Sequence, residues 1–143
     1  MTTPKAHVLL VEDSAAEARL AREALKETHF PVRLHVVSDG VEAMEFLRRE
    51  GPHKEAPRPH IVLLDLNLPR KDGREVLRDI KADEDLRRIP VVILTTSQAQ
   101  SDIRRAYELN ANCYIQKPLE LDGFIEIVKS IHRYWLQTAE LPS

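Results

Sequence analysis

The chain has 143 residues, 43% of them hydrophobic and 31% charged, a composition that excludes a largely disordered protein. Its formal net charge of −2 offers no overall basic character for binding nucleic acid. No apolar run is long enough to span a membrane, and one cysteine, Cys113, excludes an internal disulfide and favours a reducing, cytoplasmic location.

Short apolar runs alternate with longer amphipathic stretches along the chain. In order, the runs lie at residues 7–11, 32–37, 61–64, 91–94 and 113–115. Their continuous apolar character is typical of strands buried on both faces, and the stretches that follow them have the 3.6-residue period of one-sided helices. Five strand–helix units in strict alternation predict an α/β fold, in which a parallel sheet carries helices on both faces.

Smaller signals mark where the predicted helices begin and where a loop interrupts the pattern. Ser14 is placed to cap the first helix, and either Ser38 or Asp39 to cap the second. Residues 51–60 contain three prolines and a glycine, so we expect an extended surface loop before the third strand. The six histidines show no spacing typical of a metal site, and we assign them no function.

Polar side chains gather where the predicted strands end. Glu12 and Asp13 follow the first strand and Asp65 follows the third. The carboxyl ends of parallel strands meet at one edge of a sheet, where adjacent strands lie ~4.8 Å apart. At ~4 Å and an effective dielectric near 20, each pair of carboxylates repels by ~4 kcal/mol. The cluster therefore needs a cation, and a few oxygen ligands completed by water suit Mg²⁺.

A lysine and a hydroxyl complete this group of residues. Thr95 ends the fourth strand and Lys117 follows the fifth. A carboxylate, a divalent metal, a lysine and a hydroxyl around one point make a phosphoryl-transfer site, in which Asp65 is the nucleophile and an acyl phosphate is the product. The alternatives are a turn aspartate, a strand-end threonine, a solvated lysine, and Glu12 or Asp13 as an ordinary helix cap.

Five segments that span nearly the whole chain resemble the receiver domains of bacterial two-component response regulators. They are VLLVEDS at 8–14, VSDGVEAMEFL at 37–47, IVLLDLNLPRKDG at 61–73, IPVVILTTS at 89–97 and CYIQKP at 113–118. The spacing around the loop at 51–60 and the ending YWLQTAELP are similar to the single-domain regulators associated with bacterial phytochromes.

The resemblance implies a flavodoxin-like (βα)5 fold, doubly wound, with strand order 2-1-3-4-5. It implies that Asp65 is the phosphoacceptor. It also implies that Glu12, Asp13 and Asp65 hold Mg²⁺, together with the backbone carbonyl of Asn67. Of the two acids after the first strand, Asp13 is expected to be the direct ligand, and Glu12 to act through water.

The resemblance also implies roles for four residues on the last two strands and the loops after them. Thr95 would bond the phosphoryl group and move toward it, Lys117 would pair with it, and Tyr114 would be the switch aromatic that turns inward. Pro118 would follow a cis peptide bond. We add one hypothesis of our own, that the side chains of Asn67 and Ser97 border the path of an attacking water. For Tyr114, simple packing is the alternative.

Two other classes of protein fit the sequence less well. A phosphatase of the haloacid-dehalogenase type needs DxDxT or DxDxV after its first strand, and this chain has VEDS. A cofactor-binding flavodoxin-like domain needs a loop that cradles a phosphate, which the acids of VEDSAAE would repel. We therefore expect a signalling protein rather than an enzyme, with self-catalysed phosphotransfer and autodephosphorylation.

The last residues of the chain are the basis for predictions about domain organisation and binding partners. We expect residues 1–143 to form one receiver domain, with a core at about 5–137, a tail at 138–143 and no output domain. The resemblance implies a cognate sensor histidine kinase, a bacteriophytochrome among the candidates, as partner, with no nucleic acid and no membrane. A second apolar flank on the last helix predicts a homodimer through that helix and the nearby strand. The flank is Ile127, Ile131 and Tyr134, and the predicted interface also includes Trp135, Leu136 and Leu141.

Overall fold

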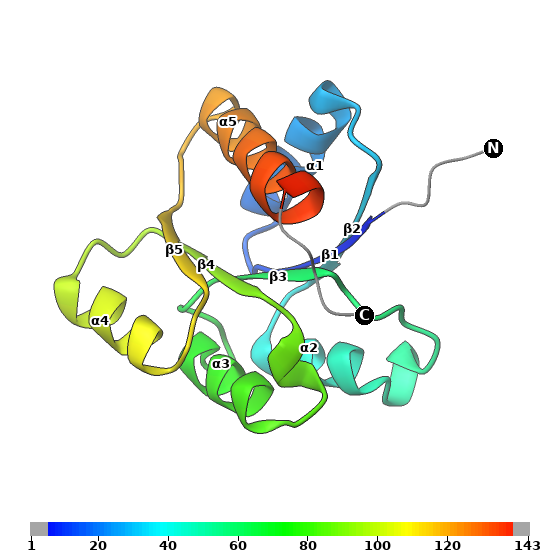
Figure 1. Cartoon of the computed structure of the whole chain (residues 1–143), viewed down its shortest axis with the longest axis vertical. Coiled ribbons are helices and arrows are strands. Elements are labelled where there is room, and N and C mark those ends of the chain that lie inside the picture. Colours follow the sequence, from blue (N-terminus) through cyan, green and yellow to red (C-terminus); the bar gives the residue numbers. More distant parts are fainter. Residues whose placement is uncertain (1–5, 139–143) are drawn as a thin grey trace.

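The computed structural model describes residues 6–138 and contains one five-stranded sheet (Figure 1). All strand pairs are parallel, and the order is β2-β1-β3-β4-β5, which confirms the predicted fold class and topology. The strands are β1 (Ala6–Val11), β2 (Val32–Val37), β3 (Ile61–Leu64), β4 (Val91–Thr95) and β5 (Cys113–Gln116). The five predicted runs match them to within one residue at each end.

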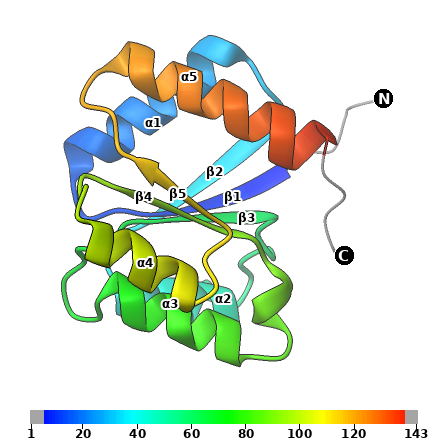
Figure 2. The ribbon, with the colours of Figure 1, turned by 60° about the vertical axis from the view of Figure 1, so that its left-hand side comes forward.

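Helices cover both faces of the sheet, with α1 and α5 on one side and α2, α3 and α4 on the other (Figures 1 and 2). The helices are α1 (Ala15–Thr28), α2 (Gly40–Arg48), α3 (Gly73–Ala82), α4 (Gln100–Glu108) and α5 (Leu121–Ile131). Two 3-10 turns, η1 (Gly51–His53) and η2 (Leu86–Arg88), lie in the loops before β3 and β4, and a π-helical segment, η3 (His132–Thr138), continues α5.

The alternation of side chains along each strand divides the core in two. On β1, Leu9 and Val11 pack toward α2, α3 and α4, while Val8 and Leu10 pack toward α1 and α5. All four residues of β3 are buried, which explains the unbroken apolar run before Asp65. Packing on both faces holds the strands, and so fixes the edge of the sheet where they end.

Side-chain caps set where the first helices begin. The Ser14 hydroxyl accepts a hydrogen bond from the Glu17 backbone N at 3.3 Å, as predicted. For the second helix, Asp39 is the cap, since its carboxylate accepts from the Glu42 backbone N at 2.8 Å. The hydroxyl of Ser38 instead donates to the Glu42 carboxylate at 3.2 Å. Each such cap stabilises its helix by about 1 kcal/mol.

The predicted contact flank on the last helix is largely part of the core. Ile131 is 7% exposed, and Ile127 and Trp135 pack against the cluster that α1 and α5 share. The prediction assumed that α5 buries one side, whereas it packs against α1 as well as the sheet (Figure 2). Of the members whose side chains the structure describes, Tyr134 alone is largely exposed, at 57%. The side chain of Leu136, and Leu141, lie outside the described residues.

Three histidines meet, His7 on β1, His35 on β2 and His60 just before β3, although their spacing in the sequence predicts no site. His7 Nδ1 and His35 Nε2 are 3.0 Å apart, and His60 Nδ1 accepts a hydrogen bond from the His7 backbone N at 3.0 Å. Burial lowers the pKa of both His7 and His35. Neighbouring positive charge, from Arg33 and from another imidazole of the group, lowers each pKa further.

These lowered pKa values predict a stability that rises with pH. Below the ordinary imidazole pKa, the unfolded chain binds protons that folded His7 and His35 do not, so the free energy of unfolding falls as the pH is lowered from about 7 to 5. Urea unfolding at several pH values measures this slope. His35→Gln is expected to flatten it, and His29→Gln, outside the cluster, to leave it unchanged. An unaltered slope in His35→Gln would contradict this assignment.

Candidate functional site

Four predicted site residues are buried at the carboxyl edge of the sheet. Glu12 is 4% exposed, Asp65 6%, Lys117 4% and Thr95 0%. Charged side chains are almost never buried this far unless they are paired. Their burial therefore requires partners within the site.

Lys117 is the centre of the pairing. Its ammonium group donates hydrogen bonds to Asp65 Oδ2 at 2.8 Å, to Glu17 Oε2 at 2.7 Å and to Glu12 Oε1. Its backbone N donates to the Thr95 carbonyl at 2.7 Å, so the pairing of β4 with β5 aims the side chain. One lysine thereby connects the ends of β1, β3 and β5 and the first turn of α1.

The site carries more negative than positive charge. Three carboxylates surround one ammonium group, which leaves a net charge of −2 when all are ionised. Burial disfavours the charged lysine, but the hydrogen bonds that it donates to Asp65, Glu12 and Glu17 outweigh this effect and raise the pKa of Lys117. Burial raises the pKa of Glu12 to about 7, against the opposing effect of Lys117. The excess charge makes this a place for a further cation.

Glu17 is the site residue that the sequence prediction missed. Oxygen atoms of Glu12, Glu17 and Asp65 lie within 4.8 Å of one another, whereas Asp13 is exposed and is no member of this group. The spacing from Ser14 to Glu17 is that of a capping box, which predicts that the glutamate turns back to the cap. Here the Ser14 backbone N donates to Glu12 instead, at 3.2 Å, and Glu17 is free to reach Lys117.

Close packing of the backbone fixes Asp65. A Cβ at Gly73 would lie 2.2 Å from the Asp65 carbonyl oxygen, so only glycine lets the start of α3 approach the end of β3. On the loop between them, the Asn67 backbone N donates to Asp65 Oδ1 at 3.2 Å, while Asn67 itself is exposed. One carboxylate oxygen therefore faces the loop and the other faces Lys117.

Thr95 carries an unsatisfied polar atom. Its hydroxyl is buried and has no hydrogen-bond partner among residues 6–138. A buried polar group without a partner costs about 1–3 kcal/mol. Such an atom beside the lysine–carboxylate cluster fits a site that receives a hydrogen-bond acceptor, such as a phosphoryl oxygen.

A chain of hydrogen bonds links the neighbourhood of Thr95 to three elements. The Tyr114 hydroxyl on β5 donates to the Ser97 carbonyl at 3.0 Å, and the Ser97 hydroxyl donates to Asp102 on α4 at 2.6 Å. Asp102 also accepts from Arg74 on α3 at 2.7 Å. The loop after β4 is thus tied to β5, α4 and α3, and the Ser97 hydroxyl is engaged with Asp102.

The predicted cis peptide before Pro118 is wrong, because the described residues contain no cis peptide bond. The trans form is favoured by about 0.5–1 kcal/mol at a bond before proline, and Lys117 reaches all three carboxylates with it.

Comparison with known proteins accounts for this arrangement. Residues 8–129 match the family described as the response regulator receiver domain. The chain belongs to this family. The receiver domain is 47% identical over 142 residues to response regulator Rcp1 of a Synechocystis strain, a match that covers 99% of this chain and 97% of Rcp1.

Two solved structures show how far the likeness extends. The phosphorylated cyanobacterial phytochrome response regulator RcpA superposes with a TM-score of 0.91 at 51% identity, over 97% of this receiver and 99% of RcpA. The Mn²⁺-bound form of Rcp1 superposes with a TM-score of 0.88 at 48% identity, over 98% and 100% of the two chains. The protein is thus a signalling receiver related to phytochrome response regulators.

Among the described residues of this receiver, no helix is both long and apolar enough to cross a membrane.

Proposed function

We propose that this receiver takes a phosphoryl group onto Asp65 from the phosphohistidine of a sensor histidine kinase. The observation that carries the proposal is the buried pair of Asp65 Oδ2 and Lys117 Nζ, 2.8 Å apart, beside the unpartnered hydroxyl of Thr95. The likeness to phytochrome response regulators makes a bacteriophytochrome-linked kinase the expected donor. We further propose that the receiver acts as a single domain in the cytoplasm.

The donor set fits Mg²⁺. The carboxylate oxygens of Glu12, Glu17 and Asp65 are hard ligands that lie within 4.8 Å of one another, around a net negative charge. We propose that Glu12 and Asp65 hold the ion, with Asp13 and the Asn67 carbonyl as the further ligands that the resemblance implies. When bound, the ion offsets the charge of the carboxylates and of the phosphoryl oxygens.

In the transfer, a carboxylate oxygen of Asp65 attacks the phosphorus, and the P–N bond of the donor breaks. The electron pair of that bond goes to the imidazole nitrogen, and the product is an acyl phosphate. The ammonium of Lys117 pairs with the phosphoryl oxygens as they leave the donor, and the hydroxyl of Thr95 donates to one of them. In autodephosphorylation, water attacks the phosphorus and the Asp65 carboxylate leaves; the Asn67 side chain borders its path.

The hydrogen bonds around Thr95 offer a way for phosphorylation to change the protein's surface. If Thr95 moves to donate to the phosphoryl group, the loop that carries Ser97 moves with it, and Tyr114, bonded to that loop, changes its position. The surface of β5 and α5 then changes with phosphorylation. We propose that a homodimer forms through this surface, with the exposed Tyr134 as its apolar contact.

The test is phosphorylation by a small donor. The protein is incubated with Mg²⁺ and phosphoramidate, whose P–N bond mimics phosphohistidine, and the intact mass is measured. We expect one phosphoryl adduct on the wild type, none on Asp65→Asn, and none on the wild type when EDTA is present. An adduct of equal yield on Asp65→Asn would contradict the proposal.

A further inference from the structure

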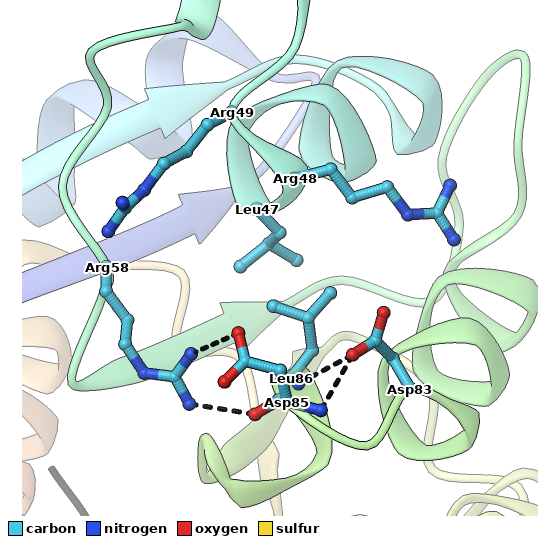
Figure 3. A pocket seen from close by; sticks show the side chains of 7 residues that line it. All are labelled: Leu47, Arg48, Arg49, Arg58, Asp83, Asp85 and Leu86. Carbon is cyan, nitrogen blue, oxygen red and sulfur yellow. Dashed lines mark hydrogen bonds and ion pairs between the residues drawn. The ribbon is translucent and has the colours of Figure 1, made fainter.

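A second concave site lies at the sheet edge opposite Asp65, between the end of α2 and η2 (Figure 3). Its volume is about 470 Å³, and the buried side chains of Leu47 and Leu86 form its floor. Arg48 is the last residue of α2 and Arg49 is its C-cap, and both are exposed. The phosphoacceptor chemistry uses none of these residues.

The acidic side chains of this cleft are already satisfied. Arg58 donates to Asp85 twice, to the carboxylate at 3.0 Å and to the backbone carbonyl at 2.9 Å, and Arg88 donates to the other carboxylate oxygen at 2.8 Å. The carboxylate of Asp83 accepts from the backbone N of Asp85 and of Leu86, at 2.8 and 3.0 Å.

The guanidinium groups of Arg48 and Arg49 are different, because neither has a hydrogen bond or ion pair among residues 6–138, although the charge of Arg48 is near enough to Asp83 to help lower the pKa of that carboxyl. In Figure 3 they extend in opposite directions from the end of α2, with Leu47 between them. A cation at a helix C-terminus is favoured by about 0.3–1 kcal/mol through the helix dipole alone. That preference explains the charge of the two residues but leaves their hydrogen-bonding capacity unused.

We propose that this cleft, defined by Arg48, Arg49, Leu47 and Leu86, binds an extended acidic segment of a partner protein. Two guanidinium groups that point apart cannot share one small anion, but a peptide with spaced carboxylates reaches both. Each arginine can take a carboxylate in a bidentate pair, and an apolar side chain of the segment can lie over the two leucines. The phosphate backbone of a nucleic acid has no apolar side chain to lie over Leu47 and Leu86, so the combination of arginines with leucines favours the peptide.

The probe is a short peptide of alternating glutamate and leucine with blocked ends, titrated into the ¹⁵N-labelled protein and followed by NMR. We expect shifts at the backbone amides of Leu47, Arg49 and Leu86, and an affinity that falls as salt is added. The double variant Arg48→Gln, Arg49→Gln is expected to bind at least about tenfold more weakly. The matched control removes two exposed arginines from α1, Arg19→Gln with Arg22→Gln, and should bind as the wild type does.

Arg49→Gly separates a lost contact from a damaged fold. Arg49 has φ 56°, a left-handed conformation that glycine adopts without strain, so this variant should remain as stable as the wild type while its affinity falls. Three results would overturn the proposal: no shifts at the cleft, an equal loss of affinity in the α1 control, or equal binding of the glutamine version of the peptide. Shifts at the cleft with anionic vesicles or DNA but not with the peptide would also do so.

Discussion

Lys117→Met is expected to lose about 3–5 kcal/mol of unfolding free energy in the absence of metal, because it leaves two buried carboxylates, Glu12 and Asp65, without their cation. The Lys117 side chain is 3% exposed and bonds to Asp65, Glu12 and Glu17. A carboxylate that takes up a proton avoids part of this loss. Since the pKa of Glu12 is already about 7, the destabilisation should grow as the pH rises above neutrality. Urea unfolding at pH 6 and pH 8 (about one pH unit either side of that pKa) measures both effects.

Two comparisons make this result specific. Lys129→Met removes a lysine on α5 whose side chain is 47% exposed, and it should change stability by no more than about 0.5 kcal/mol. Added Mg²⁺ should restore part of the stability of Lys117→Met, because it supplies the missing positive charge. If Lys117→Met is as stable as the wild type without metal, the three carboxylates do not depend on Lys117.

Thr95→Val is expected to raise the stability of the unphosphorylated protein by about 1 kcal/mol and to weaken its response to phosphorylation. The Thr95 hydroxyl is buried without a partner, so an isosteric methyl group removes an unsatisfied polar atom. In the phosphorylated protein the same change removes a donor to a charged oxygen, worth about 1.5–3 kcal/mol. Thermal unfolding with and without the phosphoryl donor measures the two effects.

Thr95→Ser keeps the hydroxyl and should retain the response. Thr96→Val alters an exposed neighbour and should leave both stability and response unchanged. A loss of stability in Thr95→Val before phosphorylation would indicate that the hydroxyl has a partner in the resting protein.

The sheet could be predicted because its strands are buried on both faces. β3 is four consecutive apolar residues, and the acid that follows it stands at the sheet edge in the structure. A last helix was also predictable from its apolar period, but its burial was not. Ile131 lies on a side of α5 that α1 covers. The apolar period of one helix does not show whether a second helix packs against it.

The candidate site, like the fold, could be predicted from the sequence only in part. Asp65, Glu12 and Lys117 follow strand ends and Thr95 is the last residue of its strand. Parallel strands end together, so the sequence was sufficient to bring the four residues together. Glu17 stands on the first turn of α1, and whether its side chain turns back to Ser14 or across to Lys117 depends on contacts between distant segments. The conformation at Pro118 likewise depends on a small energy difference that spacing does not report.

The most direct test of the central claim locates the phosphoryl group on its residue. The protein is phosphorylated with phosphoramidate and Mg²⁺, then treated with sodium borohydride, which reduces an acyl phosphate to an alcohol and leaves free carboxylates intact. Peptide mass spectrometry then shows which aspartate or glutamate has been reduced. We predict reduction at Asp65 alone, converting it to homoserine. Reduction at Asp13 or Glu12 with Asp65 intact, or no reduced residue in protein that carries the adduct, would contradict the proposed role of Asp65.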